Sequence, residues 1–172
     1  MKIAITGAHR VGKTTLAETL NESLPGYELR QEPYCDLVEK GHVFSDAPTL
    51  DYFMEQLDYS FDQVSKSGNN VIFDRCPVDI LAYIRVLNGA ATIRSLYRKV
   101  QSALTGIDLI VYVPIEDPDV ISCPESELPG LRSRVNEILN EWIRDFGIET
   151  IEVSGTLIAR RDQVINKIVQ DH

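Results

Sequence analysis

The sequence of 172 residues is poor in cysteine and lacks a long apolar run. Its cysteines are Cys35, Cys76 and Cys123, which form no C-x-x-C pair and are odd in number. This pattern argues against a zinc site and a disulfide framework, and it favours a reducing compartment. No apolar run approaches the length of about 20 residues that spans a bilayer. The first residues enter a strand-like run with no signal-peptide pattern. We therefore expect a cytoplasmic protein that does not bind membranes.

A basic surface is also missing from the composition. Seventeen Lys and Arg residues stand against 26 Asp and Glu residues, so the net charge is −9 at pH 7. Nucleic acid and anionic lipid attract basic proteins, so this balance argues against a general binder of either. The apolar share of 44% is typical of a globular protein. The length predicts one domain over residues 1–172; whether it is a monomer or a homodimer stays open.

Short apolar runs alternate with segments of helical periodicity. Apolar residues recur at helical spacing over residues 50–64 and 131–146. The strand-like runs lack strict alternation, which is typical of parallel strands covered on both faces. We therefore predict an α/β fold, a three-layer, doubly wound sheet of about five parallel strands. The predicted strands are residues 2–6, 27–31, 70–74, 107–113 and 148–153.

One stretch breaks this alternation. Residues 114–130 hold four prolines and five acidic residues without an apolar period. A well-patterned helix and strand follow the stretch, so it indicates a surface segment rather than a linker between domains. We predict a mobile lid at about residues 114–134.

The most informative motif is GAHRVGKT at residues 7–14, which matches the phosphate-binding loop (Walker A) pattern G-x-x-x-x-G-K-[ST]. The strand-like run at residues 2–6 leads into it, and a helix-like segment at residues 13–20 follows. The alternative is a chance match. The preceding strand and following helix argue against chance, because the loop needs both.

Each part of this loop has a physical role. Gly7 and Gly12 let the backbone wrap around phosphate with its N–H groups pointing at the oxygens, and the helix N-terminus adds a positive partial charge. Lys13 would reach the β- and γ-phosphates, and the Thr14 hydroxyl would ligate Mg²⁺. The predicted nucleotide-binding residues of the loop are Gly7, Ala8, His9, Arg10, Val11, Gly12, Lys13, Thr14 and Thr15.

A second motif, VIFDR at residues 71–75, is an apolar strand ending in an acid, the form of a Walker B segment. Ligands bind at the carboxyl ends of parallel strands. Asp74 can hold Mg²⁺ there or accept a proton from an attacking hydroxyl; the alternatives are a helix cap or a surface carboxylate. Arg75 suits a phosphate or can pair with Asp79. Asp79 is a candidate substrate-binding residue, or a first-turn helix acid after Pro77.

A third candidate follows the second predicted strand in the segment QEPY at residues 31–34. Glu32 lies at a carboxyl end and faces the same crevice, where it can hydrogen-bond a substrate hydroxyl. The alternative is an acid in a loop.

Together these motifs resemble the nucleoside and nucleotide kinases of the P-loop class. The run FDRCPVDILAY at residues 73–83 is most similar to a small group that includes bacterial ribosylnicotinamide kinases and is often labelled AAA-type ATPase. The resemblance spans nearly the whole chain. The phosphate loop is specific to the superfamily only, and the D-R-x-P-x-D run indicates the group without fixing the substrate.

The resemblance implies roles for matching residues. Asp74 would be the base or Mg²⁺ holder, Arg75 would touch the transferred or acceptor phosphate, and Glu32 would bind the acceptor. Arg132 and Arg134 would be lid arginines that close over the phosphates. These two are only two positions apart, so either one alone reaches ATP or the segment is not helical until the lid closes.

The last motif is VSGT at residues 153–156, followed by a helical pattern. Gly155 lets the backbone approach a flat ligand, and Thr156 can cap the helix. Similar kinases seat the adenine ring at this loop. Arg161 falls within the predicted apolar stripe of the helix, which indicates either a nucleotide contact or an arginine with a buried stem.

These features predict phosphoryl transfer from ATP with Mg²⁺ to a small acceptor, namely a nucleoside, nucleotide or ribosyl compound. The alternatives are an ATP-hydrolysing switch that acts on a protein partner, and a silent relative that only binds nucleotide. Glu32, Arg75 and the lid favour the kinase. The GTP-specific N-K-x-D pattern is absent from the sequence, which favours ATP only by default.

Overall fold

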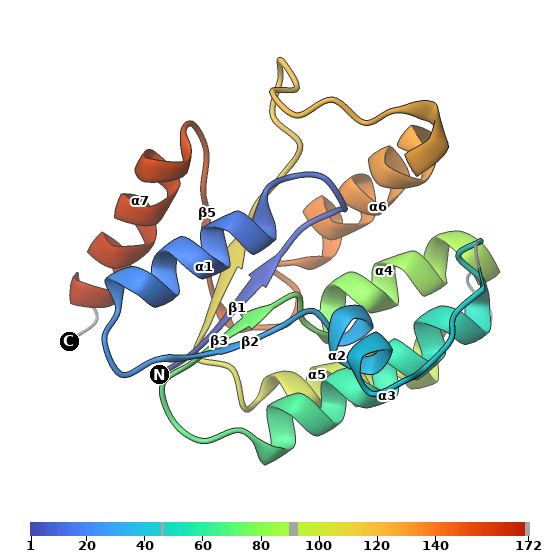
Figure 1. Ribbon diagram of the computed structural model, residues 1–172, viewed down its shortest axis with the longest axis horizontal. Coiled ribbons are helices and arrows are strands. Elements are labelled where there is room, and N and C mark those ends of the chain that lie inside the picture. The colour runs from blue at the N-terminus through green and yellow to red at the C-terminus, as the bar shows by residue number, and fades with distance from the viewer. Residues whose placement is uncertain (46, 90–92, 171–172) are drawn as a thin grey trace.

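The computed structural model describes residues 1–45, 47–89 and 93–170. Within them the chain forms a five-stranded, wholly parallel sheet in the order β2-β3-β1-β4-β5 (Figure 1). The predicted α/β fold and all five predicted strands are confirmed, with ends shifted by two residues at most. The strands are β1 (Lys2–Thr6), β2 (Glu28–Arg30), β3 (Val71–Asp74), β4 (Leu109–Tyr112) and β5 (Glu149–Glu152).

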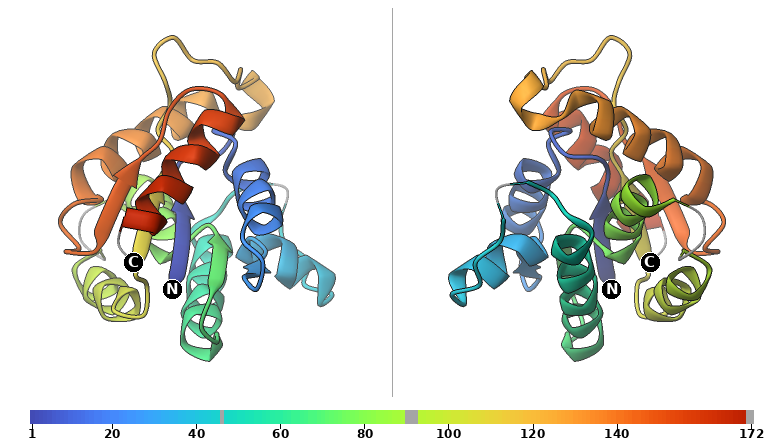
Figure 2. Two further views of the ribbon diagram at one scale, coloured as in Figure 1. Left: turned by 90° about the vertical axis from the view of Figure 1, so that its left-hand side faces the viewer. Right: turned by 90° about the vertical axis from the view of Figure 1, so that its right-hand side faces the viewer.

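The described helices fall into two groups that cover opposite faces of the sheet (Figures 1 and 2). The connection from β1 out to β2 places its helix on one face, and the connections that run back through β3 to β4 and β5 place their helices on the other. The last helix of the chain returns to the first face. The helices are α1 (Lys13–Ser23), α2 (Pro33–Glu39), α3 (Leu50–Lys66), α4 (Pro77–Asn88), α5 (Ile93–Leu104), α6 (Pro129–Trp142) and α7 (Leu157–Gln170), with a 3₁₀ turn η1 (Glu125–Glu127).

Burial explains why the central strands are continuously apolar. Every residue of β3 and β4 is buried, whereas the edge strand β5 exposes Glu149 and Glu152. Helix α1 packs with α7 on one face, and α4 lies among α3, α5 and α6 on the other. The central strands are thus covered from both sides, as parallel sheets require.

Local signals fix the helices that carry the site. The Thr49 side chain caps α3 by accepting a hydrogen bond from the Tyr52 N–H at 3.2 Å. The inward stripe of α3 contains Phe53, Leu57 and Val64, spaced as one helix face requires. Helix α3 is therefore held against α4 with a defined rotation.

Strand register places the candidate residues at one edge of the sheet. Ile5 of β1 pairs with Asp74 of β3, and Thr6 pairs with Tyr112 of β4. The loop after β1 therefore begins beside the Walker B acid, at the carboxyl edge where parallel sheets bind ligands. No helix within the described residues is long and apolar enough to cross a bilayer.

Candidate active site

The phosphate-binding loop joins β1 to α1 and needs glycine at both ends. A Cβ on Gly7 would lie 2.4 Å from the carbonyl oxygen of Val113, so a side chain there would collide with the backbone beyond β4. Gly12 has a φ of +87°, the left-handed conformation, immediately before α1. The sequence motif therefore reflects both a close approach and a backbone conformation.

Lys13 lies inside the loop rather than in solvent. Its side chain is 6% exposed, and Nζ donates a hydrogen bond to the Ala8 carbonyl oxygen at 2.6 Å. Burial lowers the pKa of Lys13, and the charge of Arg75 acts in the same direction. The ammonium group is thus held within the concave loop that would receive phosphate.

Thr14 and Asp74 meet at the mouth of the loop. The Thr14 hydroxyl donates to Asp74 Oδ2 at 2.6 Å, while Asp74 Oδ1 is buried without a hydrogen-bond partner in the structure. Burial raises the pKa of Asp74, against the hydrogen bond from Thr14 and the charge of Lys13. A hydroxyl, a carboxylate and an unused buried oxygen are donors that fit Mg²⁺. Among the described residues, no group of three or more His, Cys, Asp and Glu side chains could hold a metal by itself.

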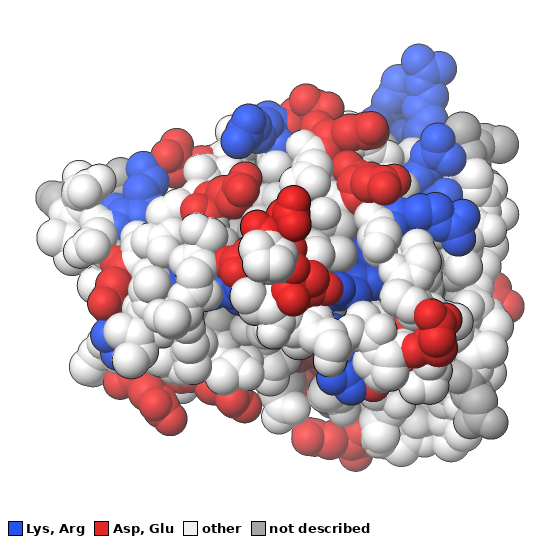
Figure 3. All heavy atoms as spheres, turned by 90° about the horizontal axis from the view of Figure 1, so that it is seen from above, with Lys and Arg blue, Asp and Glu red and all other residues white. Residues whose placement is uncertain are grey.

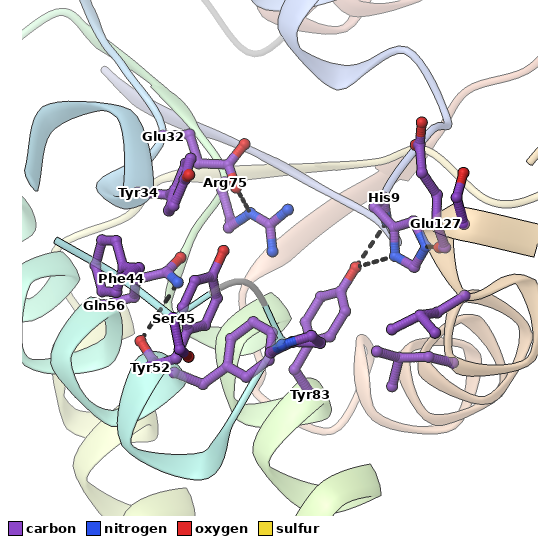
Figure 4. Close-up of a pocket in the computed structure, with 15 residues that line it drawn as sticks. His9, Glu32, Tyr34, Phe44, Ser45, Tyr52, Gln56, Arg75, Tyr83 and Glu127 are labelled. Carbon is purple, nitrogen blue, oxygen red and sulfur yellow. Dashed lines mark hydrogen bonds and ion pairs between the residues drawn. The ribbon is translucent and has the colours of Figure 1, made fainter. Parts of the chain in front are cut away.

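A cavity of about 530 Å³ lies beside the loop, lined by His9, Glu32 and Arg75. Figure 4 shows Glu32 and Arg75 facing each other at one end of this cavity. Arg75 Nε lies 2.9 Å from Glu32 Oε1, and the guanidinium carbon is 5.2 Å from the centre of the Tyr83 ring. A buried cation and a carboxylate are therefore presented together next to the phosphate loop.

The rest of the cavity has an aromatic wall (Figure 4). The ring centres of Phe44 and Tyr52, Tyr52 and Phe53, and Phe53 and Tyr83 are each 4.7 Å apart, and the last pair is stacked. Tyr34 lies 5.7 Å from Tyr52 by ring centres. Such a wall suits a flat, partly apolar ligand.

Gln56 of α3 adds a buried polar group to this wall. It is fully buried, and its Nε2 donates to the Tyr52 carbonyl oxygen at 3.3 Å. Its Oε1 is buried without a hydrogen-bond partner in the structure. Since Gln56 lines the cavity, that oxygen is an unused acceptor for a ligand donor.

Asp79, a predicted substrate-binding residue, does not line the cavity and lies in the first turn of α4, which was the alternative for it. Its fully buried carboxylate accepts hydrogen bonds from the Gly7 N–H at 2.6 Å and the Cys76 N–H at 2.9 Å. Position N3 of α4 lets Asp79 reach back to the residue that caps the helix. Asp79 therefore fixes the start of the phosphate loop to the start of α4.

His9 connects the phosphate loop to α4 and to the 3₁₀ turn η1. The backbone N–H of His9 donates to the Tyr83 hydroxyl at 2.8 Å. In its ring, Nδ1 lies 2.8 Å from the same oxygen, and Nε2 lies 2.7 Å from the Glu127 carbonyl oxygen. A carbonyl only accepts, so Nε2 carries the proton and Nδ1 accepts from Tyr83. The next residue, Arg10, forms an ion pair with the Glu127 carboxylate. The side chains at positions 9 and 10 thus hold the lid segment.

The two arginines of the predicted lid differ in their exposure to solvent. Both lie in α6, but Arg132 is 4% exposed and Arg134 is exposed. Arg132 Nε donates to the His9 carbonyl oxygen at 3.0 Å, and one amino group donates to the Arg10 carbonyl oxygen at 2.9 Å. The structure therefore brings Arg132, and not Arg134, to the phosphate loop.

The lid acids pair with arginines that surround the loop. Asp119 pairs with Arg132, and Glu116 pairs with Arg160 at 3.0 Å. Figure 3, which shows the molecule from above, has acidic and basic side chains mixed on this face. These pairs offset part of the negative charge of the predicted lid segment.

Comparison with known proteins places this geometry in a family. A family model described as an AAA domain matches residues 2–161. The chain belongs to the AAA domain family. This confirms the resemblance inferred from residues 73–83. Among curated proteins, no sequence matches the chain.

Solved structures agree with the AAA domain assignment at the level of the fold. Deoxyadenosine kinase from M. mycoides is 19% identical, with a TM-score of 0.68 and full coverage of both chains. Thymidylate kinase from Candida albicans is 17% identical, with a TM-score of 0.66 over 99% of this chain and 91% of that one. NadR protein, solved with NAD and AMP-PNP, is 18% identical, with a TM-score of 0.72 over 98% of this chain and 48% of that one. The fold is that of the P-loop nucleotide kinases.

In this AAA domain the inward arginine of α7 is Arg160 rather than the predicted Arg161. Arg161 pairs with Asp162 at 2.7 Å, whereas Arg160 is 5% exposed and donates to the Val11 carbonyl oxygen at 2.7 Å. The buried stripe runs through Arg160, Val164 and Ile168. The predicted apolar stripe was one position away from the buried one, because it included apolar residues at both ends of the helix that are in fact exposed. Gly155 donates its N–H to Glu116 Oε1 at 2.6 Å.

Three further residues of the AAA domain escaped prediction as site residues. Gln56 lies in α3 and Tyr83 in α4. In the sequence, Tyr83 is an ordinary aromatic position of a helix. Glu127 lies in the lid, where its partner is more than 100 positions away in the sequence. A polar residue inside the apolar stripe of α3 was the one available signal for Gln56.

Proposed function

We propose that this chain transfers the γ-phosphoryl group of ATP to a small acceptor, namely a nucleoside, a nucleotide or a ribosyl compound. The observation that carries the proposal is a cavity that adjoins the phosphate loop and presents Glu32 and Arg75 at its inner end. A pure ATP-hydrolysing switch has no need of such an acceptor cavity.

The nucleotide side of the reaction rests on the loop itself. Its N–H groups and Lys13 would bind the β- and γ-phosphates, with Gly155 near the adenine ring. Thr14 and Asp74 would hold Mg²⁺, which supplies charge neutralisation of the phosphates when bound. Asp74 does not line the acceptor cavity, so its role is on the metal side.

The acceptor side divides between Glu32 and Arg75. Glu32 would orient an acceptor hydroxyl and take its proton as the new P–O bond forms. The bond between the γ-phosphorus and the β–γ bridging oxygen breaks, and ADP leaves with the electron pair. Arg75 would neutralise charge that spreads over the transferred group. Both residues are held before the acceptor arrives, which lowers the cost of positioning.

The cavity wall favours an acceptor with a planar ring. Tyr52, Phe53 and Tyr83 offer stacked and edge-on aromatic surface, and Gln56 offers an unpaired acceptor oxygen. A heterocyclic base would use both features. The segment at residues 114–134 would act as the lid that excludes water during transfer.

The test is ADP release with ATP and Mg²⁺ across nucleosides, nucleoside monophosphates and ribosylnicotinamide, with product masses measured. We expect one acceptor to accelerate release and to gain a phosphate. Release that no acceptor accelerates would contradict the kinase and favour the switch that acts on a protein partner.

Lys13→Ala is the matched negative control for this test. It removes the buried ammonium group from the loop, and we expect turnover to be abolished. Near-normal turnover in this variant would contradict the mechanism.

A further inference from the structure

Cationic side chains bind the carbonyl oxygens of the phosphate loop at every residue from position 8 to position 11. Lys13 donates to the Ala8 carbonyl oxygen at 2.6 Å. Arg132 donates to the next two carbonyl oxygens at 3.0 and 2.9 Å, and Arg160 donates to the fourth at 2.7 Å. The four successive acceptors are the carbonyl oxygens of Ala8, His9, Arg10 and Val11.

A cation bound to the carbonyl oxygen of a peptide unit also affects the N–H group at the opposite end of that unit. In a trans peptide the C=O and N–H point in opposite directions. The peptide units bound by Arg132 carry the N–H groups of Arg10 and Val11, and the unit bound by Arg160 carries that of Gly12. A cation at the oxygen polarises the unit and strengthens its N–H as a donor. The arginines thus act behind N–H groups that can cradle phosphate.

Carboxylates hold both arginines in this place. Asp119 pairs with the Arg132 guanidinium, with one contact at 3.1 Å, and Glu116 pairs with Arg160 at 3.0 Å. Both guanidinium groups are buried, and a Cβ on Gly12 would lie 3.4 Å from an amino nitrogen of Arg160. While these ion pairs persist, neither guanidinium group can move to the side of the loop that would receive the phosphates.

We propose that Arg132 and Arg160 are positioning residues that hold and polarise the phosphate loop through its carbonyl oxygens, and that they do not contact the phosphates. Asp119 and Glu116 keep the forks turned toward the backbone. The proposal rests on the nucleotide site of the proposed function. It assigns the arginines of the lid and of α7 a role distinct from the charge neutralisation assigned to Arg75.

Comparing two nucleotides separates positioning from direct contact. We would measure the affinity for Mg·ADP and Mg·AMP-PNP by calorimetry in the wild type, Arg132→Lys and Arg160→Lys. A lysine cannot reproduce the planar fork. We expect each variant to lose roughly tenfold in affinity for both nucleotides alike, because the loop cradles phosphates that both share. A loss confined to AMP-PNP, or no loss, would overturn the proposal.

A second variant provides an independent check that does not require substitution of a buried arginine. The check is whether nucleotide affinity rises or falls. Asp119 is 36% exposed, so Asp119→Asn keeps the fold. Removing a carboxylate near a bound anion should tighten binding by charge alone. We expect weaker binding of both nucleotides instead, because Arg132 loses its anchor. Tighter binding would overturn the proposal.

Matched controls make the same kinds of substitution at exposed positions elsewhere. Glu125→Gln changes an exposed acid of the same lid, and Arg144→Lys changes an arginine that is 81% exposed. We expect both to bind Mg·ADP as the wild type does. Failure of the wild type to bind Mg·ADP would contradict the proposed nucleotide site, an outcome distinct from failure of the assignment to Arg132 and Arg160.

Discussion

At the scale of single residues, three acids near the strand ends serve different purposes. Asp74 faces Thr14 and has an unpaired buried oxygen, Glu32 faces Arg75 in the cavity, and Asp79 binds two backbone N–H groups. The partners of each carboxylate decide its role more than its place in the sequence does. Similar motif positions therefore carry three different roles: the metal holder and the proton acceptor that we propose, and a structural anchor.

Replacing Asp79 with Asn tests its structural role. The amide keeps one acceptor oxygen but directs an NH₂ group at a backbone N–H, so a charge-assisted bond becomes a donor facing a donor. We expect the free energy of unfolding to fall by about 1–3 kcal/mol, as measured by urea denaturation. Asp58→Asn, at an exposed position of α3, is the control. Equal stability of both variants would rule out the anchor.

Replacing Glu32 with Gln tests the proton acceptor. The amide keeps the shape of the carboxylate beside Arg75 but carries no charge and cannot take a proton at neutral pH. For the acceptor found in the panel, we expect kcat to fall about 10²-fold or more. The affinity for Mg·ADP should stay unchanged, because Glu32 lies on the acceptor side. A kcat close to that of the wild type would contradict the assignment.

At the residue scale, the motif identified Gly7 and Lys13 as loop residues from the sequence. The structure gives the physical reason for Gly7, because no side chain fits there beside Val113. Arg160 was not identifiable, because exposed Ile158 and Val169 suggested an apolar stripe rotated away from the true one. Local hydrophobicity does not report which apolar residues stay in solvent.

At the scale of elements, the phosphate loop is tied to α4 and to the lid through one histidine. His9 joins the Tyr83 hydroxyl of α4 to the Glu127 carbonyl of η1. Burial lowers the pKa of His9 below its usual 6.5, as do the charges of nearby cations, against the hydrogen bond to Glu127. The folded protein therefore favours the neutral ring.

This depression predicts how stability responds to pH. As the pH falls below 6.5, the unfolded chain takes up the proton first, so the free energy of unfolding falls until the folded-state pKa is passed. His9→Asn lacks this loss. We expect the wild type to lose more stability than the variant between pH 7.5 and 5.5 in urea denaturation. Parallel curves would show that His9 titrates alike in both states.

The elements themselves were predicted well, and their contacts were not. Residues 50–64 gave α3 because their apolar spacing is helical, and residues 70–74 gave β3 because burial on both faces leaves a continuous apolar run. Glu127 meets Arg10 across 117 positions of sequence. No local pattern encodes such a contact, because its geometry is set by how α6 and the sheet pack.

At the scale of the molecule, an acidic chain builds a local site for an anion. The net charge is −9, yet Lys13, Arg75, Arg132 and Arg160 all lie buried around the phosphate loop. Parallel register brings the loop, Asp74 and the cavity that holds Glu32 and Arg75 to one edge of the sheet. The fold therefore supplies locally the positive potential that the composition lacks.

Nucleotide binding should stabilise the whole domain. At a concentration about 100 times its Kd, Mg·ADP stabilises the folded state by about 2.7 kcal/mol. For a chain of this size that corresponds to a rise in Tm of about 5–10 °C, measured by differential scanning calorimetry. Chelating Mg²⁺ should shrink the shift, and Lys13→Ala should abolish it. An unchanged Tm in the wild type would contradict nucleotide binding.

The most direct test of the account follows the γ-phosphoryl group itself. ATP labelled in the γ-phosphate would be incubated with Mg²⁺ and each acceptor of the panel, and the label would be traced by mass in the acceptor and in inorganic phosphate. We predict that the label enters one acceptor in the wild type and that Glu32→Gln greatly reduces this transfer. Label found only in inorganic phosphate, whatever the acceptor, would contradict it.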